Sequence, residues 1–170
     1  MRRAIIPATL VTLLVVAVQL QILSSLRFAG VVIMLVWLWP LAMGLAGFTS
    51  LAVYVALVGG ILFDTHATTP LGLTAVVGLV LAYAASRLGR EGVGDLDSAA
   101  IWVTPLLGAV GGLAAPALYT FGGFFALNFG IWRGSLPAAM LVNAVAFFIL
   151  ARPMTRLAKA IALVGERARR

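Results

Sequence analysis

Residues 60–72 read Gly60-Ile61-Leu62-Phe63-Asp64-Thr65-His66-Ala67-Thr68-Thr69-Pro70-Leu71-Gly72. The stretch places the carboxylate of Asp64 between two runs that are apolar enough to cross a bilayer. An ionisable group at the centre of a membrane helix costs about 2.5–3.5 kcal/mol, and less near the surface, so it needs a partner or a role. The flanking Gly60 and Pro70-Leu71-Gly72 predict a turn in which the backbones of two helices approach closely.

Composition predicts an all-α integral membrane protein. Of the 170 residues, 63% are hydrophobic and 10% are charged, and the mean hydropathy is +1.13, whereas a soluble domain carries about 25% charged residues. The 36 residues between Arg27 and Asp64 contain no Lys, Arg, Asp or Glu. At about 1.5 Å per residue this run is too long for one crossing of a hydrocarbon core about 30 Å thick, so we expect two spans there.

The apolar runs predict a six-helix transmembrane bundle. Its spans are expected at residues 4–23, 28–47, 49–63, 70–86, 100–121 and 136–150, with residues 122–134 forming an interfacial or re-entrant segment. Thr69 is expected to cap the fourth span, and Pro70 to occupy its first helical position. Trp37 and Trp39 lie far from the span ends, so they are expected to pack inside the bundle or to face lipid.

Basic residues predict the orientation of the bundle. Six spans place both termini on one side together with the loop at residues 87–97, and ten of the 12 Lys and Arg residues fall on that side, against Arg27 and Arg133 on the other. Positive residues mark the cytoplasmic face, so both termini are expected in the cytoplasm and Asp64 at the external face. We expect its carboxylate to accept hydrogen bonds from the backbone of residues 65–69, or to pair with Arg27 or Arg133.

Two domains follow from this layout: a six-span domain at residues 1–151 and a basic amphipathic cytoplasmic tail at residues 152–170. In the tail, Leu157, Ile161 and Val164 recur at helical spacing. This pattern favours a helix on the anionic lipids of the inner leaflet, an ordinary flank of the last span, or a docking site for a cytoplasmic protein. The net charge of +7 is explained by such flanks, so no nucleic-acid partner is expected. The basic residues expected at the membrane surface are Arg152, Arg156, Lys159, Arg167, Arg169 and Arg170.

Few residues could support chemistry. His66 is the only histidine and no cysteine is present, and Asp64 with His66 would supply two metal ligands where a structural site needs about four. We therefore expect no catalysis, no metal and no cofactor. A transporter is the fairer alternative, because a few polar side chains lie in or near the spans, namely Gln19, Gln21, Asp64, His66, Asn128 and Asn143. Small residues, such as Gly59-Gly60 and Gly108 with Gly112, are expected to let helices pack closely, either within the bundle or against a partner.

Two motifs resemble the family of the rod shape-determining membrane protein MreD. The first is the order Gly60, Asp64 and Pro70-Leu71-Gly72-Leu73, with a short polar turn after the Asp. The second lies in the last span, where Leu136-Pro137 precedes Asn143 and the chain continues as Arg152-Pro153-Met154-Thr155-Arg156-Leu157. The six-span layout and the length also agree with that family.

The resemblance implies a non-enzymatic inner-membrane subunit of the bacterial cell-wall elongation complex, required for rod shape. It would act as a scaffold with MreC, and through MreC with MreB, RodA and a class B penicillin-binding transpeptidase. The resemblance also implies a bundle similar to the substrate-binding subunits of energy-coupling-factor importers. A small-molecule-binding membrane subunit of such an importer is therefore the alternative function.

Overall fold

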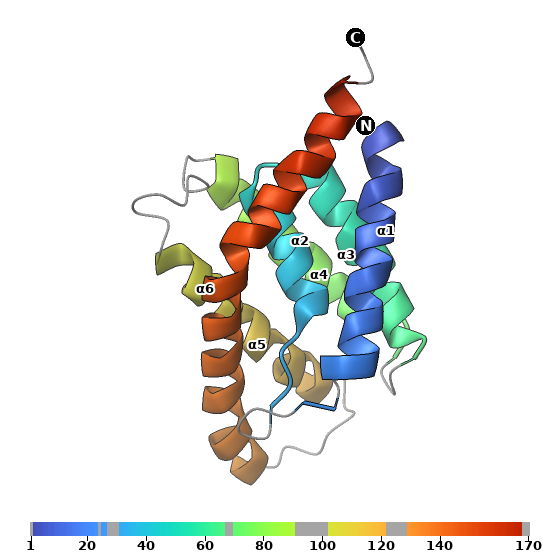
Figure 1. The fold of residues 1–170 in the computed structure, drawn as a ribbon. Coiled ribbons are helices and arrows are strands. Elements are labelled where there is room, and N and C mark those ends of the chain that lie inside the picture. The colour runs from blue at the N-terminus through green and yellow to red at the C-terminus, as the bar shows by residue number, and fades with distance from the viewer. Residues whose placement is uncertain are drawn as a thin grey trace.

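The computed structural model describes residues 2–23, 25–26, 31–66, 70–90, 102–121 and 129–167. These residues form six α-helices and one π-helical turn: α1 (Arg2–Val18), η1 (Gln19–Leu23), α2 (Leu35–Leu45), α3 (Thr49–Asp64), α4 (Leu73–Leu88), α5 (Val103–Phe121) and α6 (Phe129–Arg167). The predicted all-helical bundle of six helices is confirmed for this part of the chain (Figure 1).

Helix α2 lies at the centre of the bundle. It contacts each of the five other helices, and these contact one another in the order α1, α3, α4, α5, α6 and back to α1. Every residue of α2 from Val36 to Leu45 is buried. The sequence of α2 explains this position, because a helix that is apolar on all sides has no face to present to water.

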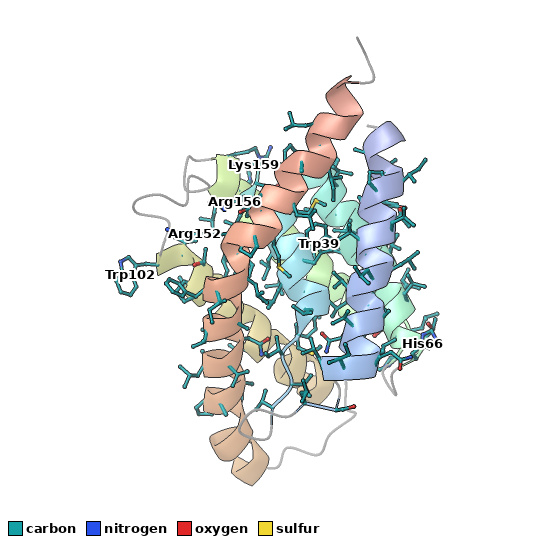
Figure 2. The ribbon with its side chains drawn as sticks, in the orientation of Figure 1. Trp39, His66, Trp102, Arg152, Arg156 and Lys159 are labelled. Carbon is teal, nitrogen blue, oxygen red and sulfur yellow. The ribbon has the colours of Figure 1, made fainter. Side chains whose placement is uncertain are left out.

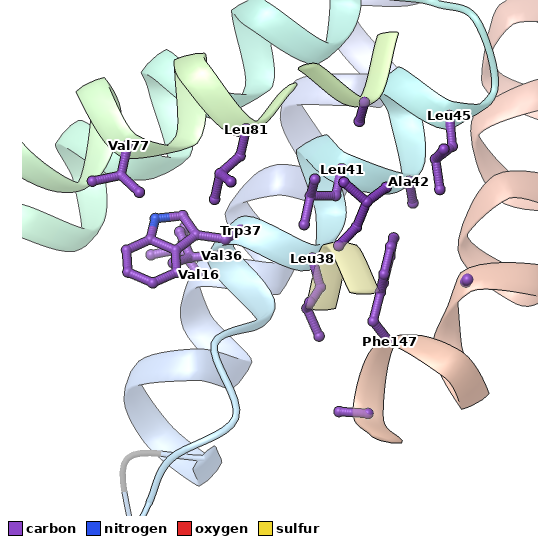
Figure 3. Close-up of a cluster of buried hydrophobic side chains, with 14 residues drawn as sticks. Val16, Val36, Trp37, Leu38, Leu41, Ala42, Leu45, Val77, Leu81 and Phe147 are labelled. Atoms are coloured by element: carbon purple, nitrogen blue, oxygen red, sulfur yellow. The ribbon is translucent and has the colours of Figure 1, made fainter. Parts of the chain in front are cut away.

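The core consists of two clusters of buried side chains on either side of α2. In one cluster, Trp37 and Leu41 of α2 pack with Leu81 of α4 and Phe147 of α6 (Figure 3). In the other cluster, Trp39 and Met43 of α2 pack with residues of α1, α3 and the C-terminal part of α6. Both tryptophans are therefore inside the bundle, which was one of the two positions predicted for them.

The second span differs from the prediction. A continuous helix was expected over residues 28–47, but α2 contains only 11 residues, and residues 31–34 before it are not helical. Hydropathy alone cannot separate an apolar helix from an apolar extended segment, so the break left no signal in the composition of this run. Gly47 has a φ of +85° and makes the predicted turn between this span and α3.

The last helix is longer than predicted. Residues 129–134, expected in an interfacial segment, belong to α6, which runs for 39 residues through Pro137 and Pro153 and across the expected domain boundary at residue 151. In its C-terminal part, Ile161 is buried with Ala4 and Ala8 of α1, whereas Leu157 is 43% exposed. Leu157 and Ile161 thus differ in burial, although they are four residues apart on the same helix. The side chain of Val164 lies outside the described residues, as do residues 122–128.

The outer surface of the helix ring is apolar. Two helices, Ala4–Leu23 and Leu136–Leu163, are long and apolar enough to cross a membrane. Exposed apolar side chains occur on all five outer helices, among them Ile6, Leu10, Leu14, Leu57, Ile61, Val76, Val80, Leu106, Leu141 and Ile149. The exposed basic side chains that the structure describes are Arg87 and Arg90, at and just after the end of α4, and Arg152, Arg156 and Lys159, in the C-terminal half of α6.

Candidate functional site

Asp64 links the end of α3 to the beginning of α4. It is the last residue of α3 and only 4% exposed. Its Oδ2 accepts a hydrogen bond from the backbone N–H of Gly72 at 2.8 Å and another from that of Thr74 at 3.0 Å. The first N–H groups of a helix have no carbonyl partner within the helix, and the helix dipole makes that end positive. The carboxylate of one helix therefore caps the next helix.

This arrangement corrects part of the prediction. Asp64 does accept backbone N–H groups, and the donors that the structure describes are Gly72 and Thr74. The N–H groups of Thr65 and His66 donate instead to the carbonyls of Ile61 and Phe63, and residues 67–69 lie outside the described residues. The alternative partners, Arg27 and Arg133, have side chains that lie outside the described residues. Helix α4 begins at Leu73, so Pro70 is not its first residue, and the backbone N–H of Leu73 donates to the carbonyl of Pro70 in a turn ahead of the helix.

Gly72 serves the backbone conformation of this turn. It precedes α4 with a φ of +90°, a region that residues with a Cβ atom seldom adopt. A Cβ atom at Gly72 would meet nothing within 4 Å. The prediction that two helices approach closely at Gly72 is therefore wrong. Gly72 matters because of its positive φ value. Leu71 beside it is 72% exposed.

The close approach occurs at Gly60 instead. A Cβ atom there would overlap the backbone N and Cα of Ala75 in α4. Gly60 and Asp64 are four residues apart and so lie on the same face of α3. Gly60 lets the backbone of α4 come close, and one turn later Asp64 caps it. The Gly-x-x-x-Asp spacing is explained by this single junction.

The central helix contacts the same junction. The indole N–H of Trp37 in α2 donates to the carbonyl of Thr74 at 3.3 Å, while the amide of Thr74 donates to Asp64. Trp39 binds α1 in a similar way, since its indole N–H donates to Oγ1 of Thr12 at 3.2 Å. Both bonds are buried. The sequence predicted that these indoles are internal but not which polar groups they bind.

A second group of polar side chains caps α2. The N–H of Leu35 donates to Oε1 of Gln19 at 2.7 Å, and that of Met34 donates to Oδ1 of Asn143 at 2.9 Å. Asn143 also donates from Nδ2 to the carbonyl of Ala139 at 2.9 Å. Gln19 and Asn143 are each 1% exposed. In the sequence, Asn143 was a candidate through the family resemblance, and Gln19 only as a polar residue in a span. The late start of α2 explains why both side chains are needed, since they accept its first N–H groups.

Two glycines of α5, Gly108 and Gly112, face α6. A Cβ atom on Gly108 would overlap the carbonyl of Asn143, and one on Gly112 would overlap the carbonyl of Ala139. A Cβ atom on Gly59 of α3 would lie 3.1 Å from the methyl group of Thr12 in α1. Whether such glycines serve contacts within the bundle or with a partner was open from the sequence. At these positions they serve contacts within the chain.

His66 lies on the surface, at the opposite end of the bundle from the basic residues of α6 (Figure 2). Its Nδ1 is 2.9 Å from Oγ1 of Thr65 and 3.0 Å from the carbonyl of Leu62. Within the described ranges, no three His, Cys, Asp or Glu side chains come close enough to hold a metal ion. The junction around Asp64 thus offers hydrogen bonds between helices rather than reactive groups.

The remaining predicted residues lie on α6. Pro137 is exposed, as are Arg152, Arg156 and Lys159. The side chains of the three basic residues point away from α1 (Figure 2). Arg167 is the last residue of the helix, and Arg169 and Arg170 lie outside the described residues. No protein-family model, no curated protein and no solved structure matches this chain.

Proposed function

We propose that this protein is a non-enzymatic membrane subunit of the bacterial cell-wall elongation complex, where it acts as a scaffold with MreC. The observation that carries the proposal is the α3–α4 junction. Its carboxylate, which would be the first candidate for chemistry, accepts two backbone N–H groups of α4 and stabilises the packing of two helices. A protein built in this way works through the surfaces of its helices.

The membrane location is supported by the outer surface. Soluble monomers seldom expose apolar patches larger than a few hundred Å², whereas all five outer helices here present exposed Leu, Ile, Val or Phe side chains. Polar groups such as Gln19, Asp64 and Asn143 are buried inside. An apolar exterior around a core that contains hydrogen-bonded polar groups is what a bilayer requires. We infer an inner-membrane protein with both termini in the cytoplasm.

The cell-wall role is supported by the resemblance to the MreD family. The residues of the first motif, Gly60, Asp64 and Gly72, act together at one junction, although two of them belong to α3 and Gly72 lies in the turn before α4. Asn143 of the second motif caps α2. In a family of scaffold proteins, residues that stabilise the same helix junction are expected to occur together in the sequence.

Complementation tests this role. In a rod-shaped bacterium that encodes the chain, its depletion should give rounded cells. The His66→Ala variant should restore rods, because the imidazole is exposed and its contacts in the described part of the chain are with its neighbours Thr65 and Leu62. A conditional strain, immunoblots for protein level and measured cell widths are needed. Rounded cells at a normal level of the His66→Ala protein would contradict a scaffold and favour a ligand or catalytic site.

The substrate-binding subunit of an importer is the second candidate function. It is favoured by the interruption of the second span, in which residues 31–34 are not helical and α2 starts only at Leu35. Interrupted helices in transporters often lie at substrate sites, where their ends contact the ligand. Here the N-terminus of α2 lies inside the bundle beside Gln19 and Asn143. In this structure the side-chain oxygens of Gln19 and Asn143 accept hydrogen bonds from the backbone N–H groups of Leu35 and Met34. A ligand at this site would bind the same N–H groups. An importer subunit should co-purify with an ATPase module and bind a small molecule tightly.

A further inference from the structure

The two sides of the bundle differ in height. Helices α3 and α4 contain 16 residues each, which is about 24 Å at a rise of about 1.5 Å per residue. A hydrocarbon core is about 30 Å thick. The α3–α4 side is thus about 6 Å too short to match such a bilayer.

Polar groups mark both ends of the short side. Ser50 is exposed at the start of α3, and Thr65 and His66 are exposed just after its end. On α4, the guanidinium of Arg87 lies 5.7 Å from the ring centre of Tyr83 and marks the other end of the apolar surface. Between these limits the exposed side chains are Leu57, Ile61, Val76, Val80, Tyr83 and Ala84, of which only Tyr83 has a polar atom.

At the end that holds Asp64, the short helices cannot grow to match a thicker bilayer. Asp64 ends α3 and at the same time caps α4, so a longer helix on either side would break its bonds to Gly72 and Thr74. The φ of +90° at Gly72 also stops α4 from extending backwards. Moving the exposed side chains of Thr65 and His66 into hydrocarbon would also be unfavourable, because polar and ionisable side chains are expensive inside a membrane.

The opposite side of the bundle is taller. Asn143 of α6 binds the N–H of Met34, and Trp37, three residues along, binds the carbonyl of Thr74 in the first turn of α4. These two contacts place Asn143 near the level at which α4 begins. From Asn143, α6 continues to Phe129, about 21 Å farther at about 1.5 Å per residue. Figure 1 shows α5 and α6 extending beyond the ends of α3 and α4 on that side.

We propose that the α3–α4 side contacts a locally thinned bilayer, in which the external surface of the membrane descends to Thr65 and His66. The partner of this surface is the acyl chains and headgroups of ordinary phospholipids. The inference rests on the membrane location proposed above and is independent of the role in cell-wall elongation. When one side of a protein has a shorter apolar surface than the other side, the bilayer becomes thinner only next to the shorter side.

Bilayers of different thickness test the inference. The full chain is reconstituted into phosphatidylcholine vesicles with monounsaturated chains of about 14 to about 22 carbons, and the midpoint of thermal unfolding is measured. The midpoint should be highest in the thinner bilayers and fall by several degrees in the thickest. A midpoint that is the same at all chain lengths would overturn the proposal, because the bundle would then adapt by tilting as a rigid body.

Matched variants localise the effect. The double change Thr65→Leu with His66→Leu raises the apolar height of the short side, so the midpoint should peak at a longer chain length. Gln21→Leu is the control, since Gln21 is exposed on η1, where the apolar run already spans the core, and it should leave the peak unchanged. An unchanged peak in the double variant, or an equal shift in the control, contradicts the proposal.

Accessibility gives an independent measurement in case the double variant does not fold. The chain has no cysteine, so a single cysteine can be placed at His66 or at Leu141, which is 66% exposed on α6 close to Asn143. A membrane-impermeant maleimide should label His66→Cys even in the thickest bilayer and should not label Leu141→Cys. Loss of His66→Cys labelling in that bilayer overturns the inference. Removal of the chain from the vesicles by alkaline carbonate would instead refute the membrane location itself.

Discussion

At the scale of single residues, Gly60, Asp64 and Gly72 stabilise one junction by three different effects. Gly60 has no side chain that would collide with Ala75, Asp64 accepts two N–H groups, and Gly72 adopts a positive φ. Since steric overlap, hydrogen bonding and backbone conformation respond differently to substitution, variants at these positions can separate the three effects.

Asp64→Ala should reduce stability more than Asp64→Asn. Alanine leaves the N–H groups of Gly72 and Thr74 without their acceptor, which costs about 1–3 kcal/mol, whereas the side-chain oxygen of asparagine can still accept one. The measurement is the amount of folded protein in membranes and its unfolding midpoint in detergent. An Asp64→Ala protein that accumulates normally but fails to restore rods would mean that Asp64 contacts a partner or ligand directly.

Gly60 and Gly72 should respond oppositely to asparagine. At Gly72, alanine costs about 1–2 kcal/mol for the left-handed conformation, and asparagine, which tolerates that conformation, should cost less. At Gly60, alanine overpacks the contact at a cost of about 1–3 kcal/mol, and asparagine should cost more because it is larger. Unfolding midpoints of the four variants decide this. Equal effects of alanine and asparagine at Gly72 would argue against a role of its φ value.

The need of Asp64 for a partner was predictable, because a carboxylate beside two apolar runs is costly. The identity of the donors was not. Local rules favour Thr69 as the cap and Pro70 as the first helical residue of the fourth span. In the structure the cap comes from Asp64 on the previous helix, so α4 begins at Leu73. A capping residue that is distant in sequence leaves no local signal.

At the scale of the elements, the sequence predicts α3 and most of α1 closely but not α2. Residues 31–34, just before α2, are Val31, Val32, Ile33 and Met34, and none of them marks the start of a helix. The break depends on Gln19 and Asn143, whose amides accept the N–H groups of Leu35 and Met34 at the start of the helix. These partners come from α6 and from the turn after α1, so only the tertiary structure determines where α2 begins.

Replacing these amides should loosen the start of α2 specifically. Asn143→Leu and Gln19→Leu have similar volume but cannot accept a hydrogen bond, so each should cost about 1–3 kcal/mol. Hydrogen exchange should become faster at the amides of Met34 and Leu35. The amide of Ala52 in α3, which donates to the carbonyl of Phe48, serves as the internal control. Unchanged exchange at Met34 in Asn143→Leu would contradict a capping role.

At the scale of the whole molecule, five helices surround α2, and α1 begins at the same end of the bundle at which α6 finishes (Figure 1). The apolar composition predicts the helical bundle, but not the central position of α2. Helix α2 is buried from Val36 to Leu45, whereas the other helices each keep an exposed face that is also apolar. Length and hydropathy do not reveal which span is surrounded by the others.

The orientation in the membrane can be tested with fused reporters. Reporters placed after Arg90 and after Arg170 should both report the cytoplasm, and one placed near Arg133 should report the outside, because ten of the 12 basic residues fall on the predicted cytoplasmic side. Alkaline phosphatase and a fluorescent protein, fused at each point, give opposite signals. An external signal after Arg90 would contradict the six-span arrangement.

The most direct test of the central proposal is purification of the tagged full chain from the membranes of its own bacterium, followed by measurement of the proteins that accompany it. A scaffold of cell-wall elongation should retain MreC in a constant ratio, and the Asp64→Asn protein, if it folds, should retain MreC as well. An ATPase module in place of MreC, together with a tightly bound small molecule, would contradict the scaffold and identify the chain as an importer subunit.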